Sequence, residues 1–136
     1  MSNKAFIAIP KLKFRAWDKK NKKMFPVMMI DFGQSYVMVK EPNGLWSERD
    51  FDEIELMQST GLVDMYDKEI FNGDVLKTSD VELAKVVWTK EFACWEAEFL
   101  SEIVGLNEVA DVESIWSDCE IVGNIYKNPE FLEEEE

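Results

Sequence analysis

The chain has 136 residues and a formal net charge of −13 at pH 7, with 28 acidic residues, 15 lysines and arginines and no histidine. This length suits a protein that buries a hydrophobic core without disulfides, and no apolar run approaches the roughly 18 residues that a membrane-spanning helix needs. Without histidine, the chain lacks the commonest general base near neutral pH and the commonest metal ligand. We therefore expect a protein that is not an enzyme, carries no cofactor or metal, and does not enter a membrane.

Charge is distributed unevenly along the sequence. Residues 1–40 contain nine lysines and arginines against two acidic residues, whereas residues 41–136 contain six against twenty-six. The difference is +7 for the first part and −20 for the second. Such asymmetry is expected of a protein with a basic face for nucleic acid, or of subunits that attract each other head to tail. We favour the second interpretation, a homo-oligomer.

The first third of the chain is predicted to form a β-meander. Residues 11–17 alternate between apolar and basic side chains, as a half-buried strand does, and the polar sequence DKKNKK then predicts a turn. Residues 24–30 would return as a strand that Pro26 restricts to a sheet edge or a bulge. Turns at residues 31–34 and 41–44 would enclose a third strand at 36–40.

The rest of the chain shows the same pattern of short apolar runs between turn residues. Strands are predicted at 51–57, 75–76, 81–89, 92–100 and 121–126, with a loop at 58–68, a short helix at 109–116 and another starting at Asn128 and Pro129. This predicts a mostly β (β-rich α+β) fold, a compact antiparallel barrel-like or meander fold with little helix. Residues expected to be buried are Leu12, Phe14, Val75, Val86, Ile121 and Ile125.

The predicted domain organisation is one unit at 1–132, which could divide into sub-units 1–57 and 58–132, followed by an acidic tail at 133–136. Cys94 and Cys119 are far apart in sequence, so we expect two buried free thiols instead of a disulfide. Trp46, Trp88, Trp95 and Trp116 are interpreted as core or interface anchors.

Two groups of charged residues were considered as binding sites. Asp64, Asp67, Glu69 and Asp74 are the densest set of oxygen ligands, but their spacing does not match a known calcium loop, and solvated turn carboxylates explain them better. The basic group Lys19, Lys20, Lys22 and Lys23 lies near aromatic residues and could contact nucleic acid. Exposed lysines also protect β-hairpins from edge-to-edge pairing, and we expect weak, salt-sensitive nucleic-acid binding at most.

Three segments, KLKFRAWDKKNKKM, LMQSTGLVDMYDKEIFNGDVL and IVGNIYKNPEFL, resemble YopX-like phage and prophage proteins in order and over nearly the whole chain. The resemblance implies a β-rich phage or prophage protein in the cytoplasm of a bacterial host, with no assigned activity and no catalytic residues to carry over. The motif residues are interpreted as turn and packing positions, with a shared ligand site as the alternative: Phe14, Trp17, Asp18, Thr60, Gly61, Leu62, Gly73, Asp74, Gly123, Asn124, Tyr126 and Pro129.

The sequence therefore predicts a phage accessory protein that binds or assembles with protein partners. The alternatives are a nucleic-acid-binding protein that uses the basic hairpin, and an acidic mimic of DNA that inhibits a host protein.

Overall fold

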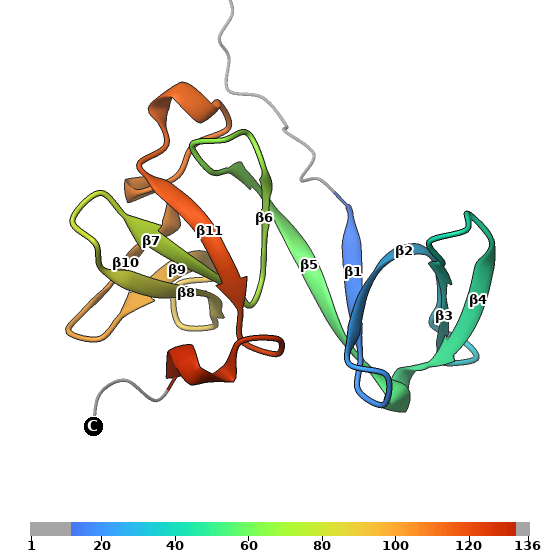
Figure 1. The fold of residues 1–136 in the computed structure, drawn as a ribbon. Coiled ribbons are helices and arrows are strands. Elements are labelled where there is room, and N and C mark those ends of the chain that lie inside the picture. Colours follow the sequence, from blue (N-terminus) through green and yellow to red (C-terminus); the bar gives the residue numbers. More distant parts are fainter. Residues whose placement is uncertain (1–11, 133–136) are drawn as a thin grey trace, which may run out of the picture.

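The computed structural model describes residues 12–132 as a β-rich protein made of two antiparallel sheets (Figure 1). The helical segments within these residues are single turns of 3-10 helix: η1 (Phe51–Glu53), η2 (Leu106–Glu108), η3 (Ser114–Trp116) and η4 (Pro129–Leu132). The predicted mostly β fold with little helix is confirmed. The described strands form open sheets and not a closed barrel.

The first sheet has six strands in the spatial order β4-β3-β2-β1-β5-β6. Strand β2 is hydrogen-bonded to both β1 and β3, so Pro26 does not lie in an edge strand; the register instead shifts between Val27 and Met29, which agrees with the predicted bulge. The bounds are β1 (Phe14–Asp18), β2 (Lys23–Asp31), β3 (Tyr36–Lys40), β4 (Trp46–Asp50), β5 (Ile54–Val63) and β6 (Glu69–Phe71).

The second sheet has five strands in the order β10-β9-β8-β7-β11. The predicted hairpin of two apolar runs is present as β8 and β9, which pair with Trp88 opposite Trp95. The bounds are β7 (Asp74–Thr78), β8 (Leu83–Thr89), β9 (Cys94–Phe99), β10 (Ile103–Gly105) and β11 (Cys119–Asn124).

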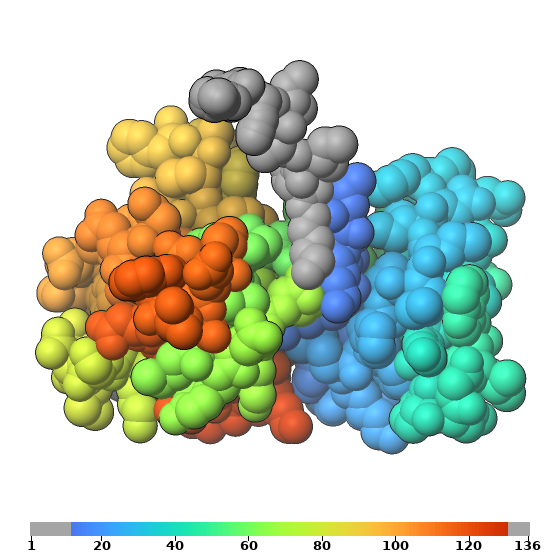
Figure 2. Space-filling view, turned by 90° about the horizontal axis from the view of Figure 1, so that it is seen from above, coloured from blue at the N-terminus to red at the C-terminus, as the bar shows by residue number. Residues whose placement is uncertain are grey.

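Each sheet encloses its own hydrophobic core. The first core lies between β1, β2, β3 and β5 and includes Ala16, Val37 and Ile54. The second core includes Leu76 and Val86 of the second sheet together with Ile70 from β6. The end of the first sheet thus covers the second core, and the two halves of the chain pack side by side (Figure 2).

Burial along β1 differs from the predicted alternation. Leu12 precedes the strand and is 76% exposed, whereas Trp17, which was assigned to the polar side, is 6% exposed. Both faces of β1 are covered, because the first core lies on one side and the second sheet on the other. Of the other residues expected to be buried, Val75 and Val86 are buried, while Phe14, Ile121 and Ile125 are half-buried.

Three local predictions were wrong. Residues 58–63 continue strand β5 instead of forming a loop, because Ser59 and Val63 pair with β6 and this pairing outweighs a turn-like local composition. The predicted strand at 51–57 begins with the 3-10 turn η1. The helix expected at 109–116 contains only the single turn η3.

Candidate functional site

Arg15 and Asp74 form the central contact between the two sheets. Arg15 Nη2 lies 2.8 Å from Asp74 Oδ1 and donates a 3.2 Å hydrogen bond to the main-chain oxygen of Asn72. The guanidinium also lies over the Phe71 ring, 4.8 Å from its centre. Burial raises the pKa of Asp74 above its usual value, and the charge of Arg15 only partly offsets this effect. The pair is therefore a buried charge contact at the junction of the sheets.

Trp17 and Tyr126 form a second contact across this junction. Their rings are stacked with centres 6.1 Å apart and planes at 20°. Beside them, Gly73 has a φ of +88°, and a Cβ at this position would lie 3.3 Å from Met57 Sδ. Glycine thus permits both the turn and the close approach of β5. Residues from all three segments of the YopX resemblance meet here.

Asp18 fixes the turn between β1 and β2 and connects it to strand β4. Its carboxylate accepts hydrogen bonds from the N–H groups of Lys20 (3.0 Å) and Asn21 (2.9 Å) and from Arg49 Nε (2.9 Å). Burial alone would raise the pKa of Asp18, but these hydrogen bonds outweigh it and lower the pKa to about 2. Arg49 also stacks on Phe25, 5.2 Å from the ring centre.

The remaining motif residues lie in turns or packing contacts. Thr60 Oγ1 donates a 2.8 Å hydrogen bond to the carbonyl of Ile70, and Gly61 has a φ of +85°. Asn124 Oδ1 accepts hydrogen bonds from Tyr126 N (3.0 Å) and Lys127 N (2.8 Å), which close the turn after β11. Leu62 packs against the second core, Phe14 borders a groove, Gly123 pairs with Val75, and Pro129 begins η4. A shared ligand site made from these residues stays a prediction.

The four carboxylates considered as a cation site have separate roles. Asp64 is fully buried and accepts hydrogen bonds from the N–H groups of three residues, and Asp74 pairs with Arg15. Glu69 lies 3.0 Å from Lys13 Nζ and accepts a hydrogen bond from Ser59 Oγ, while Asp67 is exposed. Among residues 12–132, no group of three acidic or cysteine side chains is placed to hold a metal ion.

Both cysteines are free thiols, as predicted, but only Cys119 is buried. Burial, together with the nearby charges of Asp64 and Asp118, raises the pKa of Cys119 to about 12. This thiol is therefore neutral and unreactive near neutral pH. Cys94 is half-buried beside Glu96, and burial also raises its pKa.

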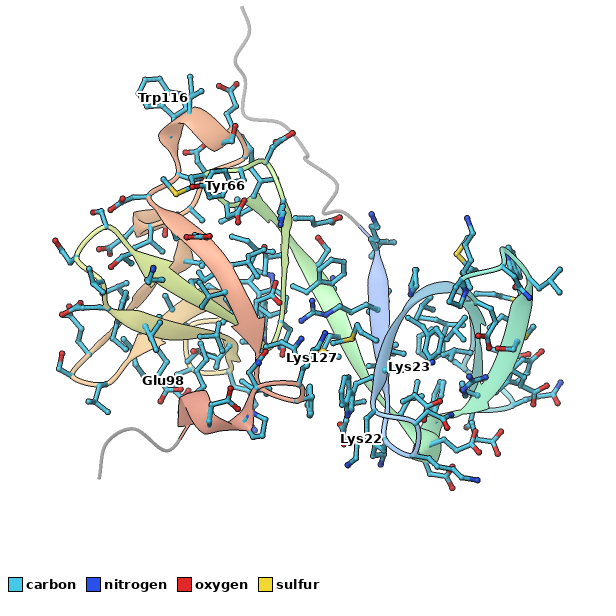
Figure 3. The ribbon with its side chains drawn as sticks, in the orientation of Figure 1. Lys22, Lys23, Tyr66, Glu98, Trp116 and Lys127 are labelled. Atoms are coloured by element: carbon cyan, nitrogen blue, oxygen red, sulfur yellow. The ribbon has the colours of Figure 1, made fainter. Side chains whose placement is uncertain are left out.

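The four lysines of the basic hairpin divide between two different surfaces. Lys19 and Lys20 line a groove that contains the carboxylates of Glu48, Asp52 and Glu53. Lys22 and Lys23 instead line a cavity of about 440 Å³ shared with Lys40 and Lys127. Figure 3 shows Lys127, on the turn after β11, facing the β1–β2 turn that carries Lys22 and Lys23. Sequence separation hid Lys40 and Lys127 from the prediction.

Tyr66 and Trp116 project from neighbouring loops at the opposite end of the second sheet (Figure 3). Tyr66 is 62% exposed and Trp116 is 69% exposed. We call the exposed apolar side chains Met65, Tyr66, Ile115 and Trp116 the aromatic surface. The sequence analysis assigned Trp116 to a core or interface but did not identify its neighbours.

The backbone beneath the aromatic surface is held by buried polar groups. Asp64 Oδ1 accepts hydrogen bonds from Tyr66 N and Lys68 N, each 2.9 Å, and Asp64 Oδ2 accepts one from Ile121 N at 2.9 Å. Ser117 Oγ donates a 2.7 Å hydrogen bond to the carbonyl of Val63 and connects the η3 loop to β5. The exposed aromatic side chains therefore stand on a fixed backbone.

The other tryptophans have different environments. Trp95 packs against the second core and meets Trp88 edge to face, with ring centres 5.1 Å apart. Both border a groove of about 650 Å³ whose opposite wall is formed by β1 and β5 residues, Thr60 among them. Trp46 is 50% exposed on the edge strand β4. The core interpretation therefore holds for Trp95 only.

These features define a two-sheet antiparallel β-protein whose halves are joined by a buried ion pair and a stacked aromatic pair. The chain belongs to the YopX family, since the model of the YopX protein family matches residues 13–133. Within the described residues, no helix is long and apolar enough to cross a membrane.

Two crystal structures have a similar fold. Protein EF1440 from Enterococcus faecalis has 25% sequence identity and a TM-score of 0.66, with 91% of this chain and 99% of that chain covered. Protein yopX from Bacillus subtilis has 14% identity and a TM-score of 0.58, with 87% and 95% covered, and supports the fold alone. No curated protein matches the chain.

Proposed function

We propose that this protein is a non-enzymatic binding module that assembles with protein partners, including further copies of itself, through the aromatic surface. The observation that carries the proposal is the exposure of Tyr66 and Trp116 on loops whose backbone is fixed by buried Asp64 and Ser117. Large aromatic side chains contribute much of the energy of protein interfaces. A rigid loop lowers the entropy that is lost on binding.

Charge around the aromatic surface indicates the kind of partner. The same loops carry the exposed carboxylates of Asp67, Glu113 and Asp118. A partner with an apolar centre and a basic rim would match them, and the basic first third of a second copy has this character. The family supports an accessory role of phage or prophage origin in the cytoplasm of a bacterial host.

Light scattering over a range of protein concentrations, at low and high salt, tests the proposal. We expect the mass to rise with concentration and the association to weaken, but persist, at high salt, because apolar burial is not screened. Trp116→Ser and Tyr66→Ser should reduce association. Phe92→Ser is the control, because Phe92 is 72% exposed on the β8–β9 turn, away from these loops.

The outcomes separate the parts of the proposal. A monomeric mass of the wild type under every condition would remove self-association. Equal association of Trp116→Ser and Phe92→Ser would show that the aromatic surface is not the interface.

A further inference from the structure

A cavity between the β1–β2 turn, the end of β3 and the turn after β11 brings four lysines together. We call it the lysine pocket; it has a volume of about 440 Å³ and is lined by Lys22, Lys23, Lys40 and Lys127 over an apolar floor that includes Pro26 and Pro42. The four ammonium groups come from separate parts of the chain (Figure 3 labels three of them). None of the four forms an ion pair with another described residue.

Electrostatics favours an anion in this pocket. Four like charges around one concavity repel each other, and a bound anion relieves that repulsion. Glu41 is the one carboxylate in the lining, and it is already engaged, since it accepts hydrogen bonds from Ser47 Oγ (2.5 Å) and Arg49 Nη2 (3.3 Å). The lysines therefore remain available to a ligand, in a protein whose net charge is otherwise strongly negative.

The turn that carries two of these lysines is held in place. Asp18 accepts hydrogen bonds from the N–H groups of Lys20 and Asn21, and the N–H of Lys22 donates a 2.8 Å hydrogen bond to the Asp18 carbonyl. Lys22 and Lys23 thus project from a fixed backbone, which reduces the entropy that is lost when a ligand binds.

The surroundings of the pocket limit the length of the ligand. On the other side of the same turn, Lys19 and Lys20 share a groove with Glu48, Asp52 and Glu53. A long polyanion that left the lysine pocket in this direction would meet carboxylates and be repelled. The volume lies within the range of small-molecule sites, and the mixture of apolar floor and few polar groups is typical of them.

We propose that the lysine pocket binds a short phosphate-bearing ligand of nucleotide size. The phosphate oxygens accept hydrogen bonds from the lysine ammonium groups, which bind phosphate as point charges, and the apolar floor contacts the uncharged part of the ligand. This site is separate from the aromatic surface and from the extended nucleic-acid contact predicted for Lys19, Lys20, Lys22 and Lys23.

Titration calorimetry of the full chain with ATP, tripolyphosphate and adenosine tests the site. We expect ATP to bind more tightly than tripolyphosphate, and adenosine to bind weakest, because only ATP uses both the lysines and the floor. The double variant Lys23→Gln/Lys127→Gln should bind ATP about tenfold more weakly. The matched control is Lys19→Gln/Lys20→Gln, which removes the same charge from the same hairpin and should change ATP affinity less than about twofold.

Further measurements keep the result clear. Circular dichroism and thermal unfolding would verify that each variant is folded, and Trp116→Ser should leave ATP binding unchanged. Absence of ATP binding at about 1 mM ligand, or equal weakening by the two double variants, would overturn the proposal. An affinity for oligonucleotides that rises with their length would assign the lysines to nucleic acid. Equal competition by a glutamate-rich peptide would assign them to an acidic protein segment.

Discussion

The Arg15 guanidinium lies 2.8 Å from the Asp74 carboxylate and thereby links strand β1 of one sheet to strand β7 of the other. The side chains are only 15% and 2% exposed, and the buried Nε of Arg15 has no hydrogen-bond partner within the described residues. A buried ion pair of this kind adds little net stability compared with apolar residues. Its consequence is specificity, because either charge left alone would be costly.

Replacing Arg15 with alanine should therefore lower the free energy of unfolding by about 3–5 kcal/mol, since the Asp74 carboxylate would remain buried without its partner. Urea denaturation would measure this change. Lys85→Ala is the control, because Lys85 and Glu98 form an exposed pair at 3.6 Å, for which a loss below about 1 kcal/mol is expected. Equal losses in the two variants would contradict the role assigned to Arg15.

Asp18 should make the protein sensitive to acid. Its folded-state pKa of about 2 lies below the usual value of 3.8, so its stabilising contribution is present above the usual pKa and is lost as pH falls from there towards 2. The shift corresponds to roughly 2 kcal/mol. Asp18→Asn should lower stability at pH 7 and flatten its decrease between these pH values.

Urea denaturation at several pH values would check the Asp18 prediction. Asp80→Asn, at an exposed turn residue, should keep the wild-type dependence on pH. If Asp18→Asn lost stability with acid as steeply as the wild type, another carboxylate would be responsible.

Two glycines allow the junction of the sheets to be tested separately from backbone strain. Gly61 and Gly73 have φ angles of +85° and +88°, but a Cβ would meet nothing within 4 Å at Gly61, whereas at Gly73 it would lie 3.3 Å from Met57 Sδ. Gly61→Ala should cost about 1–2 kcal/mol from strain alone. Gly73→Ala should cost more, as measured by thermal unfolding. An equal cost would show that Met57 moves aside freely.

The strands were largely predictable because alternating burial leaves a local pattern in sequence. Ala97 in β9 is buried, as its alternation predicts. Trp17 was assigned to the wrong side because alternation assumes one solvated face, while β1 is covered on both. Ser59, Thr60 and Gly61 were taken for a loop because their pairing with β6 has no local signal.

The candidate sites were less predictable, because each depends on contacts distant in sequence. Lys22 and Lys127 line one pocket although about a hundred positions separate them. Lys19 and Lys22 are neighbours in sequence and yet lie on surfaces of different charge. Sequence reasoning recognised the basic group, but only the fold divides it.

The last prediction concerns Asp64, which holds the backbone of the aromatic surface. Its carboxylate accepts hydrogen bonds from the N–H groups of Tyr66, Lys68 and Ile121. Asn at this position has a single acceptor oxygen, and its NH₂ group would face an N–H donor. Asp64→Asn should therefore lower stability by about 1–3 kcal/mol. It should also speed hydrogen exchange at these three amides and weaken self-association under conditions in which the variant remains folded.

Asp67→Asn provides a matched control in the same loop, with the same change of charge. Asp67 is exposed and has a φ of +65°, a conformation that asparagine tolerates well, so its stability should change by less than about 0.5 kcal/mol. If both variants weakened self-association equally, the loss of negative charge would be the cause. If only Asp64→Asn weakened it, the fixed backbone beneath Tyr66 would be required for binding, because a mobile loop loses more entropy when the partner docks.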